Sequence, residues 1–140
     1  MAIEIDHLGI AVRSLDEGVR FYEKALGMVV SRTEMVGAEQ VAVALLPAGA
    51  GPNPPRIELL EAAGPASPIA RFIEKRGPGL HHIALRVDDL PQAIERLKAE
   101  GARVLDEPRR GAGGHLYVFL HPASTGGVLL ELIQKEPVKD

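Results

Sequence analysis

The chain has 140 residues, of which 46% are hydrophobic and 25% charged, and it contains no cysteine. This length and composition are typical of one compact globular domain. The absence of cysteine excludes disulfides, thiolate metal ligands and a cysteine nucleophile. The formal net charge is -3 with scattered Lys and Arg, which does not indicate a nucleic-acid-binding surface. No apolar stretch has the length of a membrane span, and the N-terminus does not resemble a signal peptide, so we expect a cytoplasmic protein without nucleic-acid or membrane partners.

The first predicted elements are a strand and a helix. The segment Asp6–Val12 is apolar after His7 and favours a strand. Ser14 and Glu17 have the spacing of a capping box, which predicts the start of a helix. The apolar residues at three- and four-residue spacing in this helix are Leu15, Val19, Tyr22 and Leu26. Gly27 is placed to end it.

Three further strands are predicted over residues 29–35, 40–46 and 56–61, and the last of them carries Glu58. Turn-forming residues at 48–55 separate the second strand from the third. A short helix over residues 67–75 then leads to Gly77-Pro78-Gly79, where we expect it to end.

The second half of the chain repeats the same order of predicted elements. A strand carrying His82 leads to a helix that Asp89 caps, with Leu90, Ile94 and Leu97 on its apolar face, and Gly101 follows. Strands are predicted over residues 103–105, 116–121 and 128–134, and the last of them carries Glu131.

The two halves form an internal repeat. His7 and His82 lie 75 positions apart, and the same offset relates Leu15 to Leu90. Glu58 and Glu131, each between aliphatic residues, lie 73 positions apart. We therefore predict an α+β fold of two tandem βαβββ modules that form a curved mixed sheet around a metal site. The expected organisation is a single domain over 1–140, with a first module at 1–64, a linker helix at 65–79 and a second module at 80–140.

Two imidazoles and two carboxylates at equivalent positions of the repeat suit a divalent transition metal. Taken singly, a strand histidine is more often structural, and a strand glutamate more often faces water. Because the repeat relates His7 to His82 and Glu58 to Glu131, we favour one site made by all four.

Several segments resemble the methylmalonyl-CoA epimerase family of the vicinal oxygen chelate superfamily, and the resemblance covers nearly the whole chain. The most particular of them are Ser67-Pro68-Ile69-Ala70, Gly79-Leu80-His81-His82 and Gly126-Gly127-Val128-Leu129-Leu130-Glu131-Leu132. Further matching segments are Ile5–Val12, Ile57–Glu61 and Phe119–Pro122.

The resemblance implies that His7, Glu58, His82 and Glu131 bind one divalent metal per chain, with Co²⁺ or Mn²⁺ preferred over Zn²⁺ or Ni²⁺. Glu58 stands where some members have glutamine. The implied reaction interconverts the 2R and 2S forms of methylmalonyl-CoA by removing and returning the C2 proton through a metal-stabilised enolate, with Glu131 as one base. A CoA thioester substrate and a homodimer are implied as well.

The chain departs from the family in the strand over residues 40–46. Some members carry a second catalytic glutamate there, and the aligned position is Ala42 or Ala44. The second base is therefore unassigned among Glu39, Gln40, Glu58 and a metal-bound water. The loop of Arg109 and Arg110 either contacts CoA phosphates or only joins two strands. The Ser124-Thr125-Gly126-Gly127 turn has the same two interpretations.

Two other functions remain open at this point. A lactoylglutathione lyase-like isomerase would use the same kind of ligand set, and a non-catalytic small-molecule-binding module would share the fold. An extradiol dioxygenase is disfavoured because that chemistry uses two histidines and one carboxylate, whereas Glu58 adds a fourth ligand.

Overall fold

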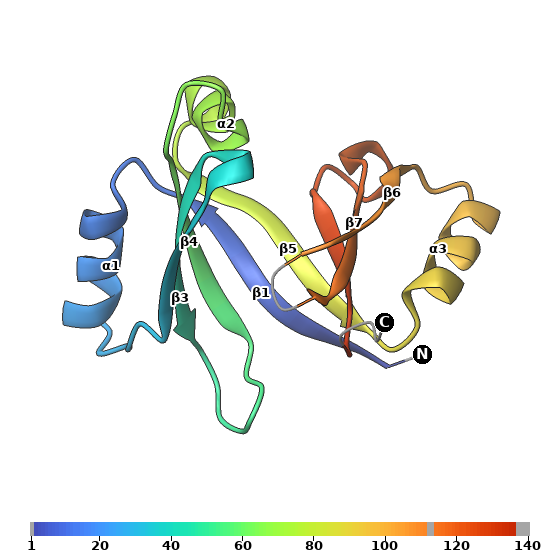
Figure 1. Ribbon diagram of the computed structural model, residues 1–140, viewed down its shortest axis with the longest axis horizontal. Helices are drawn as coiled ribbons and strands as arrows, with labels where there is room; N and C mark the ends of the chain where they lie inside the picture. The colour runs from blue at the N-terminus through green and yellow to red at the C-terminus, as the bar shows by residue number, and fades with distance from the viewer. Residues whose placement is uncertain (1, 112–113, 137–140) are drawn as a thin grey trace. The chain divides into compact units, whose positions relative to one another are not determined.

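The computed structural model describes residues 2–111 and 114–136 (Figure 1). Its helices and strands are, in chain order, β1 (Ile3–Ala11), α1 (Leu15–Lys24), β2 (Arg32–Val36), β3 (Val41–Pro47), β4 (Arg56–Ala62), α2 (Pro68–Arg76), β5 (Gly79–Val87), α3 (Leu90–Ala99), β6 (Val104–Arg110), β7 (Leu116–Leu120) and β8 (Leu130–Gln134). Short 3-10 helices lie at η1 (Gly37–Glu39) and η3 (Pro122–Ser124). None of the helices in the described part of the chain has the length and hydrophobicity of a membrane span.

The strands form a mixed eight-stranded sheet in the order β2-β3-β4-β1-β5-β8-β7-β6. The pairs β1–β4 and β5–β8 are parallel, whereas β2–β3, β3–β4, β6–β7 and β7–β8 are antiparallel. Each half therefore pairs its first strand with its last, which is the arrangement that two βαβββ modules give. The predicted α+β class and mixed sheet are confirmed.

The chain divides into two units. The first unit is made of residues 7–81, and the second of the described residues up to 6 and from 82 onward. Strands β1 and β5 each contribute residues to both units. The module boundaries predicted at residues 64 and 79 stay a prediction.

In the first unit, α1 covers one face of the sheet beside β3 and β4 (Figure 1). Ser14 caps the helix, because its hydroxyl oxygen accepts a hydrogen bond from the Glu17 backbone N–H at 3.2 Å. Leu15, Val19 and Tyr22 pack on a buried core. The core residues of this face are Ala44, Leu46 and Leu59.

The expected burial of Leu26 is wrong: its side chain is 58% exposed. Helix α1 ends at Lys24, and Gly27 follows with φ +72°, so Leu26 lies beyond the last turn and leaves the helical face. The periodicity of the sequence continued past the point where the backbone stops being helical.

The other face of the first unit packs against α2. Ile69 of that helix is buried among apolar strand residues, and Phe72 and Ile73 pack beside it. The strand residues of this second core are Ala11, Val41, Val43, Leu45 and Leu60. The face that carries this core is also the face that carries Glu58, as the register below shows.

In the second unit, Asp89 caps α3 by accepting a hydrogen bond from the Gln92 N–H at 3.1 Å. Leu90, Ala93 and Ile94 of the helix pack against Val118 and Leu132. The first residues of β1 are attached to this unit by an ion pair between buried side chains, because Arg86 Nη1 lies 3.4 Å from Asp6 Oδ1.

The last strand of each half also caps the helix of that half. Leu15 N–H donates to Glu61 Oε1 at 2.6 Å, and Leu90 N–H donates to Gln134 Oε1 at 2.7 Å. Each contact satisfies a helix N-terminal N–H that has no partner within its own helix. Glu61 and Gln134 lie 73 positions apart, which is also the offset between Glu58 and Glu131. The internal repeat therefore includes the residues that cap the two helices.

We predict that Glu61→Ala and Gln134→Ala each lower the free energy of unfolding by about 1 kcal/mol, because each leaves a partly buried N–H without its acceptor. The measurement is urea denaturation followed by circular dichroism. Glu23→Ala on the exposed side of α1 is the matched control and changes the value by less than about 0.5 kcal/mol. A loss no larger than that of the control would contradict a stabilising role for these caps.

Candidate functional site

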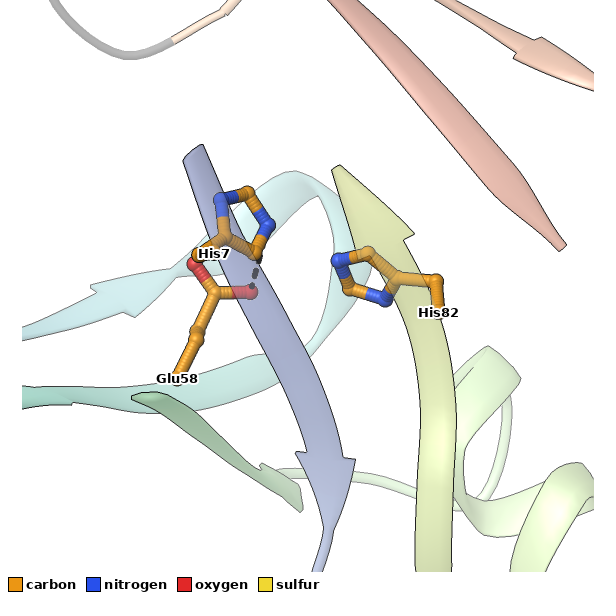
Figure 2. A group of neighbouring side chains, drawn as sticks. All are labelled: His7, Glu58 and His82. Carbon is orange, nitrogen blue, oxygen red and sulfur yellow. Dashed lines mark ion pairs between the residues drawn. The ribbon is translucent and has the colours of Figure 1, made fainter. Parts of the chain in front are cut away.

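In the first unit, the pairing of β1 with β4 places His7 and Glu58 on one face of the sheet. Gly9 lies directly opposite Glu58 in the parallel register, and His7 is two residues before Gly9. Since alternate residues of a strand share a face, His7 and Glu58 are diagonal neighbours. Figure 2 shows the two side chains converging, with His7 Nε2 3.6 Å from Glu58 Oε1. The side chains are 7% and 18% exposed.

The second unit repeats this arrangement with His82 and Glu131. Ala84 lies directly opposite Glu131 in the parallel pairing of β5 with β8, and His82 is two residues before Ala84. His82 Nε2 lies 3.4 Å from Glu131 Oε1, and the side chains are 6% and 13% exposed. The same diagonal register in both halves therefore produces two equivalent histidine–glutamate pairs.

The residues opposite the two glutamates are small. Gly9 faces Glu58 and Ala84 faces Glu131, and both small residues are buried. A glutamate carboxylate that is mostly removed from water needs a charged, metal or hydrogen-bonding partner. In each pair the imidazole is such a partner, and a nitrogen and an oxygen donor are held side by side where a divalent cation could bind both.

An aromatic wall borders the pair of the second unit. Phe119 lies directly opposite Glu131 on β7, and its ring meets the His82 ring edge-on at a centroid distance of 6.0 Å. Tyr117 continues this wall, with its ring 6.0 Å from that of Phe119. These rings did not stand out in the sequence as site residues. The apolar run over 116–120 was the one available signal, since a strand there places residues 117 and 119 on a common face.

The remaining histidines have other partners. The His81 ring packs edge-on against Phe72 at 4.9 Å, and burial lowers the pKa of His81 below its ordinary value. His115 Nδ1 lies 2.8 Å from the Gln134 carbonyl oxygen. His121 Nδ1 accepts a hydrogen bond from the Ala123 N–H at the start of η3.

The register of β3 shows on which face of the sheet Ala42 and Ala44 lie. Glu58 lies opposite Leu45, so the residues of β3 that share its face are Val41, Val43 and Leu45. Ala42 and Ala44 point to the opposite face, where Ala44 packs in the core beneath α1. Neither aligned position therefore shares the face of Glu58, and the alignment itself stays a prediction.

The two loops with open interpretations are internally bonded. Arg109 forms an ion pair with Asp106, which has φ +65° beside a bulge between β6 and β7. Residues 112 and 113 of this loop lie outside the described residues. In the turn at 124–127, Thr125 Oγ1 accepts a hydrogen bond from the Val128 N–H, and Ser124 Oγ accepts one from Arg103. These contacts hold the turn in place, and its two interpretations stay predictions.

Comparison with known proteins identifies relatives over almost the whole chain. Residues 6–119 match the profile of the Glyoxalase/Bleomycin resistance protein/Dioxygenase superfamily. An ethylmalonyl-CoA/methylmalonyl-CoA epimerase of Cereibacter sphaeroides is 41% identical over 133 residues, which are 93% of this chain and 96% of the relative.

Solved structures agree with the sequence match. The crystal structure of methylmalonyl-CoA epimerase from Mycobacterium tuberculosis is 39% identical with a TM-score of 0.84, covering 95% of this chain and 88% of that one. A methylmalonyl-CoA epimerase in complex with methylmalonyl-CoA and NH4+ is 36% identical with a TM-score of 0.89, covering 100% and 99%. The chain therefore belongs to the Glyoxalase/Bleomycin resistance protein/Dioxygenase superfamily, and within it to the methylmalonyl-CoA epimerase family.

Proposed function

We propose that this protein is a metal-dependent epimerase that interconverts the 2R and 2S forms of methylmalonyl-CoA. The observation that carries the proposal is the pair of equivalent histidine–glutamate contacts, His7–Glu58 and His82–Glu131, in a chain of the epimerase family. The relative with bound methylmalonyl-CoA supports a CoA thioester as the substrate class. The lactoylglutathione lyase-like and non-catalytic alternatives receive no comparable support.

His7, Glu58, His82 and Glu131 are the proposed ligands of one divalent metal ion per chain. The donor set fits, because imidazole nitrogens and carboxylate oxygens together suit divalent first-row transition metals. His7, Glu58 and His82 are candidate ligands of one ion. Glu131 Oε1 lies 3.4 Å from His82 Nε2. Co²⁺ or Mn²⁺ is the proposed ion, with Zn²⁺ and Ni²⁺ as the other candidates. A bound ion would supply Lewis-acid stabilisation of negative charge on substrate oxygens.

Glu131 is the proposed base for one face of C2. Its side chain is 13% exposed, its carboxylate lies beside an imidazole, and Phe119 stands directly opposite it on β7. This environment removes most of the water from around the carboxylate, while its remaining exposure lets a proton taken from carbon exchange with solvent. A positioned general base of this kind contributes roughly 10²–10⁴-fold to a proton transfer.

We predict that the protein binds one equivalent of Co²⁺ and that His82→Ala weakens this binding by at least about 100-fold, since loss of a supporting contact alone costs roughly 10–100-fold. The measurement is isothermal titration of apoprotein. His121→Ala is the matched control, because His121 caps η3 instead of contacting a carboxylate, and it binds cobalt like the parent protein. Equal binding by both variants would remove His82 from the ligand set.

We predict that the cobalt-loaded protein epimerises methylmalonyl-CoA and exchanges its C2 proton in deuterated water, and that Glu131→Gln slows both by roughly 10²–10⁴-fold. Glutamine keeps the size and an oxygen donor but cannot accept the proton. Proton NMR follows exchange and inversion in one sample.

Two results would overturn the proposed reaction. Folded, metal-loaded protein that leaves methylmalonyl-CoA unchanged but converts the glutathione adduct of methylglyoxal would be a lactoylglutathione lyase. Protein that binds the CoA thioester without exchanging its C2 proton would be a binding module.

The cytoplasmic location expected from the sequence stays a prediction.

A homodimer is proposed for the solution state. Strands β2 and β6 end the strand order, so each has an edge that another chain can cover. Most soluble oligomers are homo-oligomers, and two-fold dimers are the commonest of them. We predict that sedimentation equilibrium at micromolar concentration gives twice the mass of one 15.0 kDa chain. A mass of one chain under these conditions would contradict the dimer.

A further inference from the structure

The proposed ligand set has no net charge once a divalent ion is bound. His7 and His82 bind a metal as neutral imidazoles, and the carboxylates of Glu58 and Glu131 cancel the two positive charges of the ion. The proposed substrate has a free carboxylate next to its thioester, and removal of the C2 proton adds further negative charge. Because a positively charged site attracts such a group more strongly than a neutral site does, a cation beside the ligands would favour its binding.

Arg56 lies beside the two ligand candidates of the first unit. It is the first residue of β4, and it stands directly opposite His7 in the parallel pairing with β1. Since alternate residues of a strand share a face, Arg56 also shares the face of Glu58, which follows two residues later in β4. From the usual strand spacing and rise, the Cα atom of Arg56 is about 5 Å from that of His7 and about 7 Å from that of Glu58.

The Arg56 side chain is partly buried, and its Nε atom is shielded from solvent. A guanidinium keeps its positive charge in such an environment. Partial burial reduces the screening of that charge by water and salt. The charge of Arg56 therefore acts on its neighbours more strongly than the charge of an exposed arginine does.

The charged residues of β2 on this face neutralise each other. Arg32 lies opposite Leu45, which in turn lies opposite Glu58, so Arg32 shares the face of Glu58. Its Nη2 atom is 3.0 Å from Glu34 Oε2, and the two side chains are 57% and 30% exposed. Strand β2 is also two strands away from β4. Among the described strand residues on this face of the first unit, Arg56 is thus the cation nearest to Glu58 along the sheet.

We propose that Arg56 is a specificity-determining residue, whose positive charge favours acyl groups that carry a free carboxylate over acyl groups that do not. This inference rests on the proposed epimerase function. With Arg56 included, the metal-loaded site has one positive charge in excess, which matches the single negative charge of the substrate carboxylate. The role is electrostatic, so it requires the charge of Arg56 and no contact with the reacting carbon.

The test is isothermal titration of cobalt-loaded protein with two CoA thioesters that differ in the carboxylate. An equilibrated mixture of the methylmalonyl-CoA epimers carries the carboxylate, and turnover leaves its composition unchanged. Propionyl-CoA lacks the carboxylate. We expect Arg56→Gln to weaken the binding of methylmalonyl-CoA roughly tenfold, the effect of about one partly buried unit charge, and to change the binding of propionyl-CoA less than about twofold.

Three further variants separate the charge of Arg56 from its packing. Arg32→Gln removes the same charge from the exposed pair on β2, and it binds both thioesters like the parent protein. Arg56→Lys keeps the charge and also binds like the parent protein. The double variant Arg56→Gln with Glu58→Gln loses one charge of each sign, so at saturating cobalt it regains most of the affinity for methylmalonyl-CoA.

The binding of cobalt to apoprotein is a second readout that does not depend on a thioester. Removal of a cation beside the ligands leaves the cobalt affinity unchanged or raises it, whereas a disturbed structure around His7 and Glu58 lowers it. Weaker cobalt binding by Arg56→Gln, or an equal loss of affinity for both thioesters, would contradict the electrostatic role.

The outcomes distinguish this inference from the function on which it rests. A parent protein that binds neither thioester would overturn the epimerase proposal and the role of Arg56 with it. A parent protein that binds methylmalonyl-CoA, together with an Arg56→Gln variant that binds it equally well, would overturn the role of Arg56 alone and leave the metal site and Glu131 in place.

Discussion

A nearly buried glutamate is the constraint on which the site depends. Burial of an ionised carboxylate without a partner costs several kcal/mol, so each of Glu58 and Glu131 needs a group that compensates its charge. In both halves a histidine of the neighbouring parallel strand stands at the diagonal position, 3.6 Å and 3.4 Å away. The sheet register thus determines the ligand geometry, because a slip by one residue would turn the histidine to the opposite face, on which α1 or α3 packs.

Much of this arrangement could be predicted from the chain because the signals are local or periodic. Ser14 and Asp89 cap the helices that were expected, and Gly27 and Gly101 follow them with positive φ. Glu61 and Gln134 share the offset of Glu58 and Glu131, although their role as helix caps did not stand out in the sequence. A repeat is informative here because two independent segments must satisfy the same physical requirements.

Other features depend on contacts between distant residues and could not be predicted. The Arg86–Asp6 ion pair joins residues 80 positions apart, and no local pattern marks it. The face on which Ala42 and Ala44 lie follows from a one-residue register, which sequence alignment does not fix when loop lengths differ. Strand β6 runs to Arg110 instead of ending near residue 105, because the bulge around Asp106 lets a charged segment containing Pro108 continue the pairing.

The small residues opposite the two glutamates place a limit on how this protein can diverge. Gly9 and Ala84 contribute almost no volume above the sheet where Glu58 and Glu131 extend. A larger side chain at either position would occupy the space beside the carboxylate while all four ligand candidates stayed in the sequence. The site therefore constrains the size of residues 9 and 84, and a chain that kept all four ligand candidates but gained bulk there would have less room beside the carboxylates.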